Sequence, residues 1–519
     1  MKAMMKRTVF ATPDSLNGKL QAAEKAWAFK DYQGAIEALQ SASRLAPANT
    51  SILLRLGGWS GLRYDYAAAE RCFEKALRLT PRKHEMVEQI ITHCLNFRHP
   101  DIAERYLRLA LEQPGAAPQT CIQLAELYER LRRVPEAVQL VERVLAANPN
   151  YPAALLVRAR LERLEGRLET AEQTLRSFIT KANPDIWLQT QAWYELGMIL
   201  DRQNQFDDAM AAFLQAKALL RPQADGYLAM LKQSRAQFKI IEAKISAERL
   251  RHWAANGPVL PPARRLALLC GHARSGTTLL EQVLDAHSEI VSAEETPTIL
   301  DEAYAPLTRH LPPDTEMLAV LESSANSELQ QSRAAYFRVM DLVVGNPVGS
   351  RLLVDKNPYA NYLIPAFIRI FPETKFLIAL RDPRDVVLSC FMQPQPLSVI
   401  KSAYLSLAGT AEDYAAVMSV WRTLAPLMPD SYLEVRYEDV VTNLESVARK
   451  TLEFLGVPWD ARVLGFDAHA RNKLVRTPTY ADVTQPIYQR ARGRWRSYQK
   501  YLEPHLEKLE PFVRAFGYE

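Results

Sequence analysis

A short phrase recurs six times at nearly constant spacing in the first half of this 519-residue chain. Each copy is centred on an alanine, and successive alanines lie 34, 34, 34, 34 and 38 residues apart. A proline follows each of these alanines by 11 to 13 residues. The alanines are Ala35, Ala69, Ala103, Ala137, Ala171 and Ala209, and the prolines are Pro47, Pro81, Pro114, Pro149, Pro184 and Pro222. Such a period indicates a fold built by stacking one small unit, because a single helix pair cannot bury its apolar face alone.

A 34-residue period with a small residue at the helix contact and a closing proline resembles the tetratricopeptide repeat. The sixth unit fits best, with Trp193, Leu196, Gly197, Phe206, Ala209, Phe213, Ala216 and Pro222 in the expected order. The resemblance implies an all-α, right-handed solenoid of about six helix pairs over residues 17–222. Its concave groove would bind an extended peptide or protein segment. Unrelated amphipathic helices of a bundle would not keep one phase over six units.

A helical segment and a linker are predicted over residues 223–264. Apolar residues recur on one face up to about residue 254, at Leu228, Leu231, Phe238, Ile241 and Ile245, and we expect this helix to cap the solenoid. The stretch "NGPVLPPAR" at 256–264 then breaks the pattern with three prolines and a glycine. The second domain is therefore predicted to cover 265–519.

Composition narrows the class of partner and the compartment. The net charge of +5 is spread over 64 basic and 59 acidic residues, without the dense basic run of a nucleic-acid footprint. No apolar stretch reaches the length of a membrane span, and the start lacks the apolar core of a secretory signal. The five cysteines are scattered and lack metal-ligand spacing. We therefore expect a cytoplasmic protein that binds no nucleic acid and has no membrane span.

The second domain begins with a sequence typical of a phosphate-binding loop. An apolar run, "RRLALLCG", leads into "GHARSGTTLL" at 271–280, and helical spacing follows. A second strand and helix start are predicted in "TKFLIALRDPRDVVLSCFMQ". Together they predict an α/β domain with a parallel sheet and ligand groups at the carboxyl ends of its strands. The loop differs from that of nucleotide hydrolases because Thr277 occupies the position of the lysine that reaches the terminal phosphates.

The missing lysine indicates a less charged terminal group than a triphosphate with magnesium. The candidate magnesium ligand, Asp382, lies in "LRDPR", which is not a magnesium-binding pattern. Arg274, the loop hydroxyls and the helix N-terminus could together hold a group with one negative charge on its terminal oxygens. A sulfuryl group attached to phosphate fits that description.

"GxxRSGTTLL" followed by "LRDPRDVVLS" resembles the sulfotransferase superfamily that uses 3′-phosphoadenosine 5′-phosphosulfate (PAPS), and is similar to its protein-tyrosine branch. The resemblance covers roughly residues 265–519, a P-loop-like sulfotransferase domain. It implies that PAPS and the product 3′-phosphoadenosine 5′-phosphate bind to the loop, to an arginine and serine eight residues apart, to a tyrosine in "VRYEDV" and to a basic C-terminal segment. The implied residues are Arg274, Ser275, Gly276, Thr277, Thr278, Arg381, Ser389, Tyr437, Arg494 and Trp495.

The same resemblance implies the catalytic residues. Glu295 in "SAEET" lies 21 residues beyond Arg274 and would be the general base, with Glu294 as the alternative and His287 as a rival. Lys356 in "DKNP" would neutralise the bridging oxygen of the leaving group. Thr479 stands where the family has a serine that assists this lysine. Arg274 would help to steady the leaving phosphate, and no metal would be required.

Three functions stay open from the sequence. The first is a PAPS-dependent sulfotransferase acting on tyrosine of a peptide delivered by the repeat groove. The second keeps the donor but uses a carbohydrate or small phenol as acceptor, in which case the repeats would serve to form a homo-oligomer. The third is a non-catalytic repeat scaffold whose α/β domain senses a nucleotide. A sensor need not keep the acid–base set of Glu295, Lys356 and Arg274, which favours an enzyme.

Overall fold

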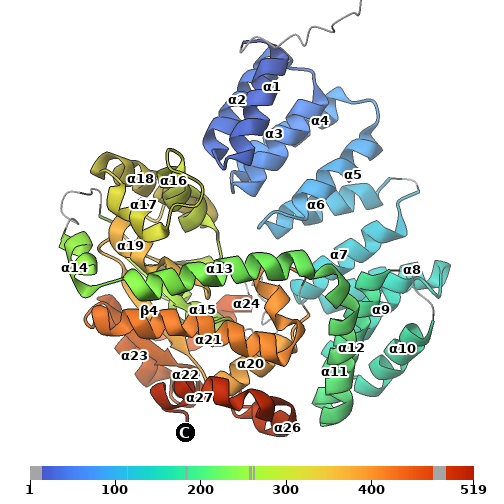
Figure 1. The fold of residues 1–519 in the computed structure, drawn as a ribbon. Helices are drawn as coiled ribbons and strands as arrows, with labels where there is room; N and C mark the ends of the chain where they lie inside the picture. The colour runs from blue at the N-terminus through green and yellow to red at the C-terminus, as the bar shows by residue number, and fades with distance from the viewer. Residues whose placement is uncertain are drawn as a thin grey trace, which may run out of the picture. The chain divides into compact units, whose positions relative to one another are not determined.

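The computed structural model describes residues 14–113, 115–181, 185–255, 260, 263–394, 396–471 and 487–519. The chain divides into two compact units, one ending at Leu127 and the other spanning Tyr128–Glu519 (Figure 1). No helix in these ranges is both long and apolar enough to pass through a membrane.

Consecutive helices of similar length form the first unit. They are α1 (Leu16–Ala28), α2 (Tyr32–Leu45), α3 (Thr50–Leu62), α4 (Tyr66–Leu79), α5 (Lys83–Cys94), α6 (Pro100–Leu111) and most of α7 (Pro118–Arg130). Asp31 and Asp65 begin equivalent helices by accepting hydrogen bonds from the backbone N–H of Gly34 and Ala68. The sequence repeat therefore corresponds to a structural repeat of two helices.

The helix pairs continue into the second unit. They are completed by α8 (Val134–Ala147), α9 (Pro152–Leu164), α10 (Leu168–Thr180), α11 (Ile186–Arg202) and α12 (Phe206–Leu220). All six repeat alanines occupy the fourth position of the second helix of their pair and are at most 5% exposed. The predicted role of a small residue at the helix contact is confirmed. Pro114 and Pro184 lie outside the described residues.

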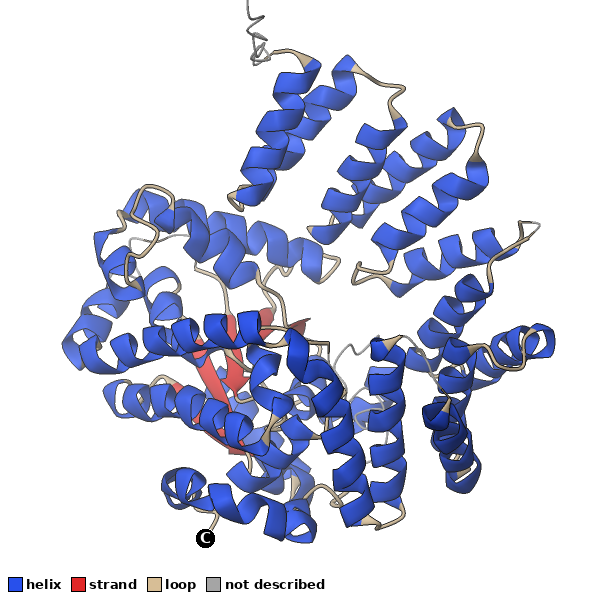
Figure 2. Cartoon of the chain, turned by 45° about the vertical axis from the view of Figure 1, so that its right-hand side comes forward, coloured by secondary structure: helices blue, strands red, loops and turns tan. Residues whose placement is uncertain are grey.

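The rest of the second unit alternates strands and helices around one sheet (Figure 2). The strands are β1 (Leu266–Gly271), β2 (Ile290–Glu294), β3 (Leu352–Lys356), β4 (Lys375–Leu380) and β5 (Tyr432–Arg436). The helices are α13 (Asp225–Lys244), α14 (Ala247–Ala255), α15 (Thr277–Asp285), α16 (Ala305–Thr308), α17 (Met317–Ser323), α18 (Asn326–Val343), α19 (Ile364–Ile370), α20 (Pro383–Phe391), α21 (Leu407–Leu424), α22 (Tyr437–Thr442), α23 (Leu444–Leu455), α24 (Phe466–Arg471), α26 (Gln499–Leu502) and α27 (Leu506–Ala515). Shorter turns include η3 (Ile299–Tyr304) and η5 (Ile400–Leu405).

The sheet is parallel throughout, with the order β2-β3-β1-β4-β5. Both faces are covered, because successive β1 side chains enter two different apolar clusters: Leu266, Leu268 and Cys270 in one, Ala267 and Leu269 in the other. The predicted strand, loop and helix of the phosphate-binding motif are confirmed by β1 and α15, and the second predicted pair by β4 and α20.

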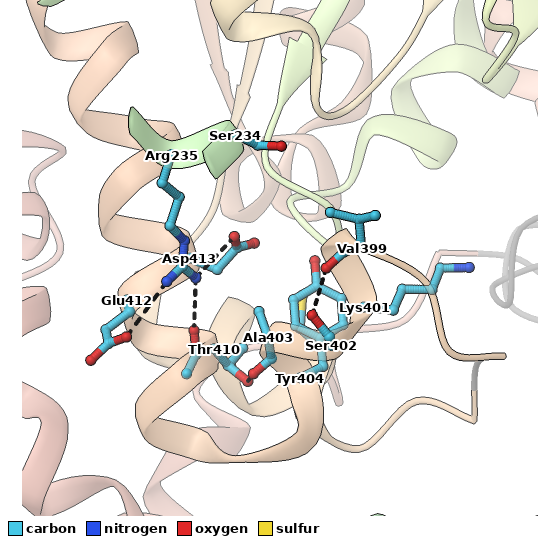
Figure 3. A network of polar contacts seen from close by, with 12 residues as sticks. Ser234, Arg235, Val399, Lys401, Ser402, Ala403, Tyr404, Thr410, Glu412 and Asp413 are labelled. Carbon is cyan, nitrogen blue, oxygen red and sulfur yellow. Dashed lines mark hydrogen bonds and ion pairs between the residues drawn. The ribbon is translucent and has the colours of Figure 1, made fainter. Parts of the chain in front are cut away.

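The last two repeats share a hydrophobic core with the sheet domain. One cluster of buried side chains runs from Leu156 and Ala171 in repeat five through Phe213 in repeat six to Leu268 of β1. The helix that follows the repeats, α13, packs on α21. Arg235 of α13 lies 3.5 Å from the carboxylate of Glu412 and 3.2 Å from that of Asp413, both on α21 (Figure 3). Repeats five and six are thus part of one packed unit with the α/β domain.

Candidate active site

Strand register brings the predicted site residues to one edge of the sheet. Leu269, two residues before the end of β1, pairs with Lys356 at the end of β3, and Glu294 at the end of β2 pairs with the same lysine. On the other side of β1, Gly271 pairs with Ala379 near the end of β4. Arg381 directly follows β4, and Tyr437 directly follows β5. In an open parallel sheet, this edge is where ligands bind.

Two glycines shape the loop between β1 and α15. Gly271 has a φ of 142°, and a Cβ there would lie 2.4 Å from the backbone oxygen of Ala379. Gly276 has a φ of 90°, and its Cβ would lie 2.7 Å from the ring of Tyr437. Neither position tolerates a side chain without displacement of its neighbour. The close approach leaves the N-terminus of α15, with the buried Ser275, Thr277 and Thr278, available to cradle an anion.

Arg274 and Glu295 have left-handed backbone conformations, with φ of 69° and 47°. In the described part of the α/β domain, they are the two non-glycine residues with positive φ. The remaining four, Lys30, Tyr64, Arg132 and Asn204, lie in turns between the two helices of a repeat. Strained backbone persists where surrounding structure requires it and clusters at functional sites. The two residues predicted to contact the reacting group are the ones that carry this strain.

The predicted arginine and serine of the second anion site lie against the loop. Arg274 Nε donates to Ser389 Oγ at 3.1 Å, and Arg381 Nη1 donates to the backbone oxygen of Arg274 at 3.1 Å. The Arg381 guanidinium carbon lies 4.9 Å from the ring centre of Tyr437. The structure therefore brings together Arg274, Arg381, Ser389 and Tyr437.

Arg381 has spare capacity for an anion. Its Nη2 donates to the Ala491 backbone oxygen at 2.6 Å, and Asp385 lies 3.9 Å away, so the contact with this aspartate is loose. Its Nε is buried and has no hydrogen-bond partner among the residues that the structure describes. A buried N–H without an acceptor is costly, and a phosphate oxygen would satisfy it. The geometry fits the phosphate that the sequence predicts here.

The basic C-terminal segment is fastened to α20. Asp385 accepts hydrogen bonds from the backbone N–H of Gly493 at 2.7 Å and of Trp495 at 2.8 Å. Trp495 is buried, with the Arg384 guanidinium 4.2 Å from its ring centre. The Arg494 guanidinium forms an ion pair with Asp201 of α11. The structure thus places Trp495 beside α20 and turns Arg494 toward repeat six.

Lys356 is the centre of a buried charge cluster. Its Nζ lies 2.9 Å from Glu295, 3.4 Å from Glu281 and 3.7 Å from Glu294. Burial alone would lower the pKa of Lys356, but the carboxylates of Glu281, Glu295 and Glu294 outweigh it and raise the pKa above its ordinary value. Lys356 is therefore an ammonium at neutral pH. The backbone oxygen of Lys356 also accepts from the N–H of Glu295 at 2.7 Å, which holds this glutamate in place.

Three further residues bear on the predicted site. Thr479 lies outside the described residues. His287 lies between the C-terminus of α15 and the start of β2, where its ring nitrogens meet the Pro458 oxygen and the Glu289 N–H, both at 2.9 Å. It is thus at the opposite end of α15 from the loop. Glu281 was not predicted, although its spacing of four residues from Thr277 places it on the helix face that carries the loop hydroxyls.

His272 connects the loop between β1 and α15 to the helices α21 and α13. It is fully buried, and its Nε2 lies 3.6 Å from Asp413, which also accepts from the Tyr359 hydroxyl at 2.7 Å. Burial opposes protonation, but the nearby Asp413 carboxylate and Cys390 raise the pKa of His272 to about 10. Arg235 reaches the same Asp413 from α13 (Figure 3). The first residue of the loop is thereby tied to α21 and α13.

Sequence profiles of known families match both halves of the chain. A profile of the sulfotransferase family matches residues 267–461, and tetratricopeptide-repeat profiles match 122–186 and 190–219. An Aquifex aeolicus protein of uncharacterised function is 25% identical over 78% of this chain and 52% of its own length. Protein-tyrosine sulfotransferase A of Caenorhabditis elegans is 26% identical over 48% of this chain and 66% of its own length. Among solved structures, the sulfotransferase domain of a Synechococcus olefin synthase covers 49% of this chain and 97% of that domain, with 22% identity and a TM-score of 0.33.

The chain thus spans about half to two thirds of the length of these curated relatives. The profile match begins in β1 and contains the loop, Lys356, Arg381 and Tyr437, which the structure gathers at one sheet edge. The chain therefore joins tetratricopeptide repeats to a domain of the sulfotransferase family.

Proposed function

We propose that this protein transfers a sulfuryl group from PAPS to an acceptor hydroxyl, with tyrosine of a peptide as the first acceptor to test. The observation that carries the proposal is the shared edge of the sheet. There, a strained Arg274 contacts the Ser389–Arg381 pair on one side of β1, while a strained Glu295 contacts Lys356 on the other. The residues proposed to bind the donor and those proposed to transfer the proton therefore lie on the two sides of the same loop.

The loop side accounts for the donor. The N–H groups and hydroxyls at the start of α15, with Arg274, would hold the 5′-phosphosulfate. Ser389 and the unsatisfied Nε of Arg381 would hold the 3′-phosphate. Tyr437 and Trp495, each facing an arginine, would pack near the nucleoside. This anion site needs no lysine in the loop, because two arginines supply the charge.

The Lys356 side accounts for the chemistry. The acceptor oxygen would form a bond to sulfur as the bond from sulfur to the bridging phosphate oxygen breaks, and the electron pair of that bond would leave with 3′-phosphoadenosine 5′-phosphate. Glu295 would receive the hydroxyl proton, and Lys356 would stabilise the charge that grows on the bridging oxygen. Glu281 and Glu294 would keep Lys356 protonated while Glu295 is engaged with the acceptor. Positioning and charge stabilisation then supply most of the rate, as in phosphoryl transfer.

Calorimetric titration tests the donor. We expect the protein to bind 3′-phosphoadenosine 5′-phosphate and to ignore ATP with magnesium, and we expect Arg381→Ala to abolish the binding. Arg176, an exposed arginine on α10, is the control, and Arg176→Ala should bind the bisphosphate normally. Binding of ATP instead of the bisphosphate would overturn the donor assignment.

Transfer of radiolabelled sulfate from PAPS tests the reaction and its acceptor. A tyrosyl peptide, its phenylalanine counterpart, a simple phenol and an oligosaccharide would be offered in parallel. We expect label on the tyrosyl peptide, none on the phenylalanine peptide, and a loss of about 10² to 10⁴ in rate for Glu295→Gln with bisphosphate affinity retained. Label on the oligosaccharide alone would show that the acceptor is a carbohydrate and not a tyrosyl peptide. Bisphosphate binding without transfer to any acceptor would favour a nucleotide sensor.

A further inference from the structure

His272, the residue after β1, is buried between two hydrogen-bond acceptors. Its Nδ1–H donates to the backbone oxygen of Ala273 at 2.9 Å, and its Nε2 lies 3.6 Å from the Asp413 carboxylate. The ring centres of Tyr359 and Tyr414 lie 5.3 and 5.1 Å from that of the imidazole, so aromatic rings pack around it. Because both ring nitrogens face acceptors, this geometry requires a proton on each of them.

Asp413 keeps this ring in place from α21. Its carboxylate also accepts from the Tyr359 hydroxyl at 2.7 Å. Arg235 of α13 donates to it at 3.2 Å (Figure 3). Asp413 is buried, and a buried carboxylate depends on such donors. The position of the His272 ring is therefore set by groups that lie outside the loop.

The carbonyl group that His272 contacts belongs to the peptide bond before Arg274. Rotation of this peptide about the N–Cα bond of Arg274 is the φ angle of Arg274, which is 69°. The Cys390 thiol of α20 contacts the same oxygen at 3.5 Å, and the neighbouring Ser389 accepts from Arg274 Nε at 3.1 Å. A left-handed arginine is strained and persists only where its surroundings require it. His272 and Cys390 provide this constraint on the backbone, and Ser389 contacts the side chain.

We propose that His272 is a positioning residue for the donor: it fixes the Ala273 carbonyl and thereby keeps Arg274 in the left-handed conformation that directs its guanidinium toward the 5′-phosphosulfate. The identity of the donor rests on the proposed sulfuryl transfer, but the effect of His272 on the backbone does not. Without His272, the peptide would turn, Arg274 would relax to a negative φ, and its guanidinium would move away from Ser389. The loop is thus preorganised for an anion before the donor binds.

A comparison of glycine with alanine at position 274 measures the constraint on the backbone without any ligand. Arg274→Gly and Arg274→Ala both remove the guanidinium, but only alanine is strained at a positive φ. We therefore expect Arg274→Gly to unfold at a higher urea concentration than Arg274→Ala. When His272→Phe or the smaller His272→Leu is added, this difference should disappear, because the loop is then free to relax.

His287→Phe is the matched control. His287 is also buried and bonded to a backbone oxygen, that of Pro458, but it lies at the other end of α15. Its replacement should lower stability and leave the difference between glycine and alanine at position 274 intact. A general loss of packing is thereby separated from a change in the conformation of the loop.

Calorimetric titration with 3′-phosphoadenosine 5′-phosphate tests the consequence for the donor site. We expect His272→Phe to weaken binding about tenfold or more, and His287→Phe to bind normally. His272→Asn should stay within about threefold of the original affinity, because its amide N–H can take the place of the Nδ1–H beside the Ala273 oxygen.

The possible failures can be told apart. A difference between glycine and alanine that survives in His272→Phe would overturn the constraint on the backbone. An unchanged bisphosphate affinity in His272→Phe, or an equal loss in His272→Asn, would overturn the positioning role. If the original protein bound no bisphosphate, the proposed donor would be refuted, and the comparison at position 274 would still decide whether His272 fixes the conformation of Arg274.

Discussion

Lys356 shows how a single residue holds this site together. It is fully buried with three glutamates around it, and one of them, Glu281, is fully buried as well. Glu281 is further fixed by a hydrogen bond from Ser292 at 2.9 Å. The cluster therefore contributes to stability apart from its proposed catalytic role, since removal of the ammonium leaves carboxylates buried without their counter-charge.

We predict that Lys356→Met lowers the free energy of unfolding by about 3–5 kcal/mol. Folding raises the pKa of Lys356, so its contribution is complete below the ordinary lysine pKa and is lost only as the pH rises through the still higher folded value. The destabilisation should thus be constant from pH 6 to 8 in urea titrations. Lys356→Met combined with Glu281→Gln should recover part of it, and an unfolding midpoint equal to that of the original protein would contradict the predicted charge cluster.

Lys217 should show the opposite pH dependence. Burial lowers the pKa of Lys217 to about 7, whereas the unfolded chain keeps the ordinary lysine pKa. Between pH 7 and about 10, Lys217 is therefore neutral in the native state and protonated in the unfolded state. Lys217 therefore costs stability most at and below pH 7, and the cost fades as the pH rises toward 10. We predict that Lys217→Met stabilises the protein by on the order of 2–4 kcal/mol at pH 6 and by little at pH 10.

Thermal or urea unfolding of Lys217→Met across this range checks the prediction, with the exposed Lys232→Met as the control that should show no such trend. A stability gain that does not change with pH would contradict the prediction, because it would mean that folding does not lower the pKa of Lys217. A gain at low pH would mark the lysine as a residue kept at the expense of stability.

At the scale of elements, the phosphate-binding motif was predictable because its parts are consecutive in sequence. β1, the glycine turn and α15 occupy 20 successive positions around the quoted loop, and local residue types decide each of them. Glu281 and Lys217 were missed for the converse reason. Each lies on a helix where a charged residue would normally face solvent, and only distant segments, β3 for Glu281 and η5 for Lys217, bury it. The direction of Arg494 depends likewise on repeat six.

The loop itself gives an element-scale prediction. Gly276→Ala must place a Cβ against the Tyr437 ring in a left-handed backbone conformation, at a cost of about 1–3 kcal/mol that falls on the loop. We expect bisphosphate affinity to fall about tenfold or more, with circular dichroism unchanged. Gly226→Ala on α13, where a Cβ would meet nothing within 4 Å, should bind the bisphosphate normally. Equal affinities of the two variants would show that the loop relaxes without penalty.

On the scale of the whole molecule, repeat six acts as part of the α/β domain. Asp201 at the end of α11 accepts from the buried Tyr498 hydroxyl at 2.7 Å and pairs with Arg494. Tyr498 also packs edge-on against Phe206 of α12, with ring centres 5.4 Å apart. Because Asp385 fastens the backbone of residues 493 and 495 to α20, this joint lies one residue from the proposed donor site.

Asp201→Ala should therefore affect both stability and donor binding. It removes the acceptor of a buried hydroxyl and the partner of Arg494, so we expect a loss of about 1–3 kcal/mol in unfolding free energy and a measurable drop in bisphosphate affinity. Asp207, six residues further along the chain, contacts Lys500 and Tyr501 of the same C-terminal segment, but Asp207 and Lys500 are both well exposed. Asp207→Ala is thus the matched control, and exposed pairs of this kind contribute little. If both variants lost equal stability and neither changed bisphosphate affinity, repeat six would have no influence on the proposed donor site. A loss of stability and of bisphosphate affinity in Asp201→Ala alone would show that repeat six supports that site.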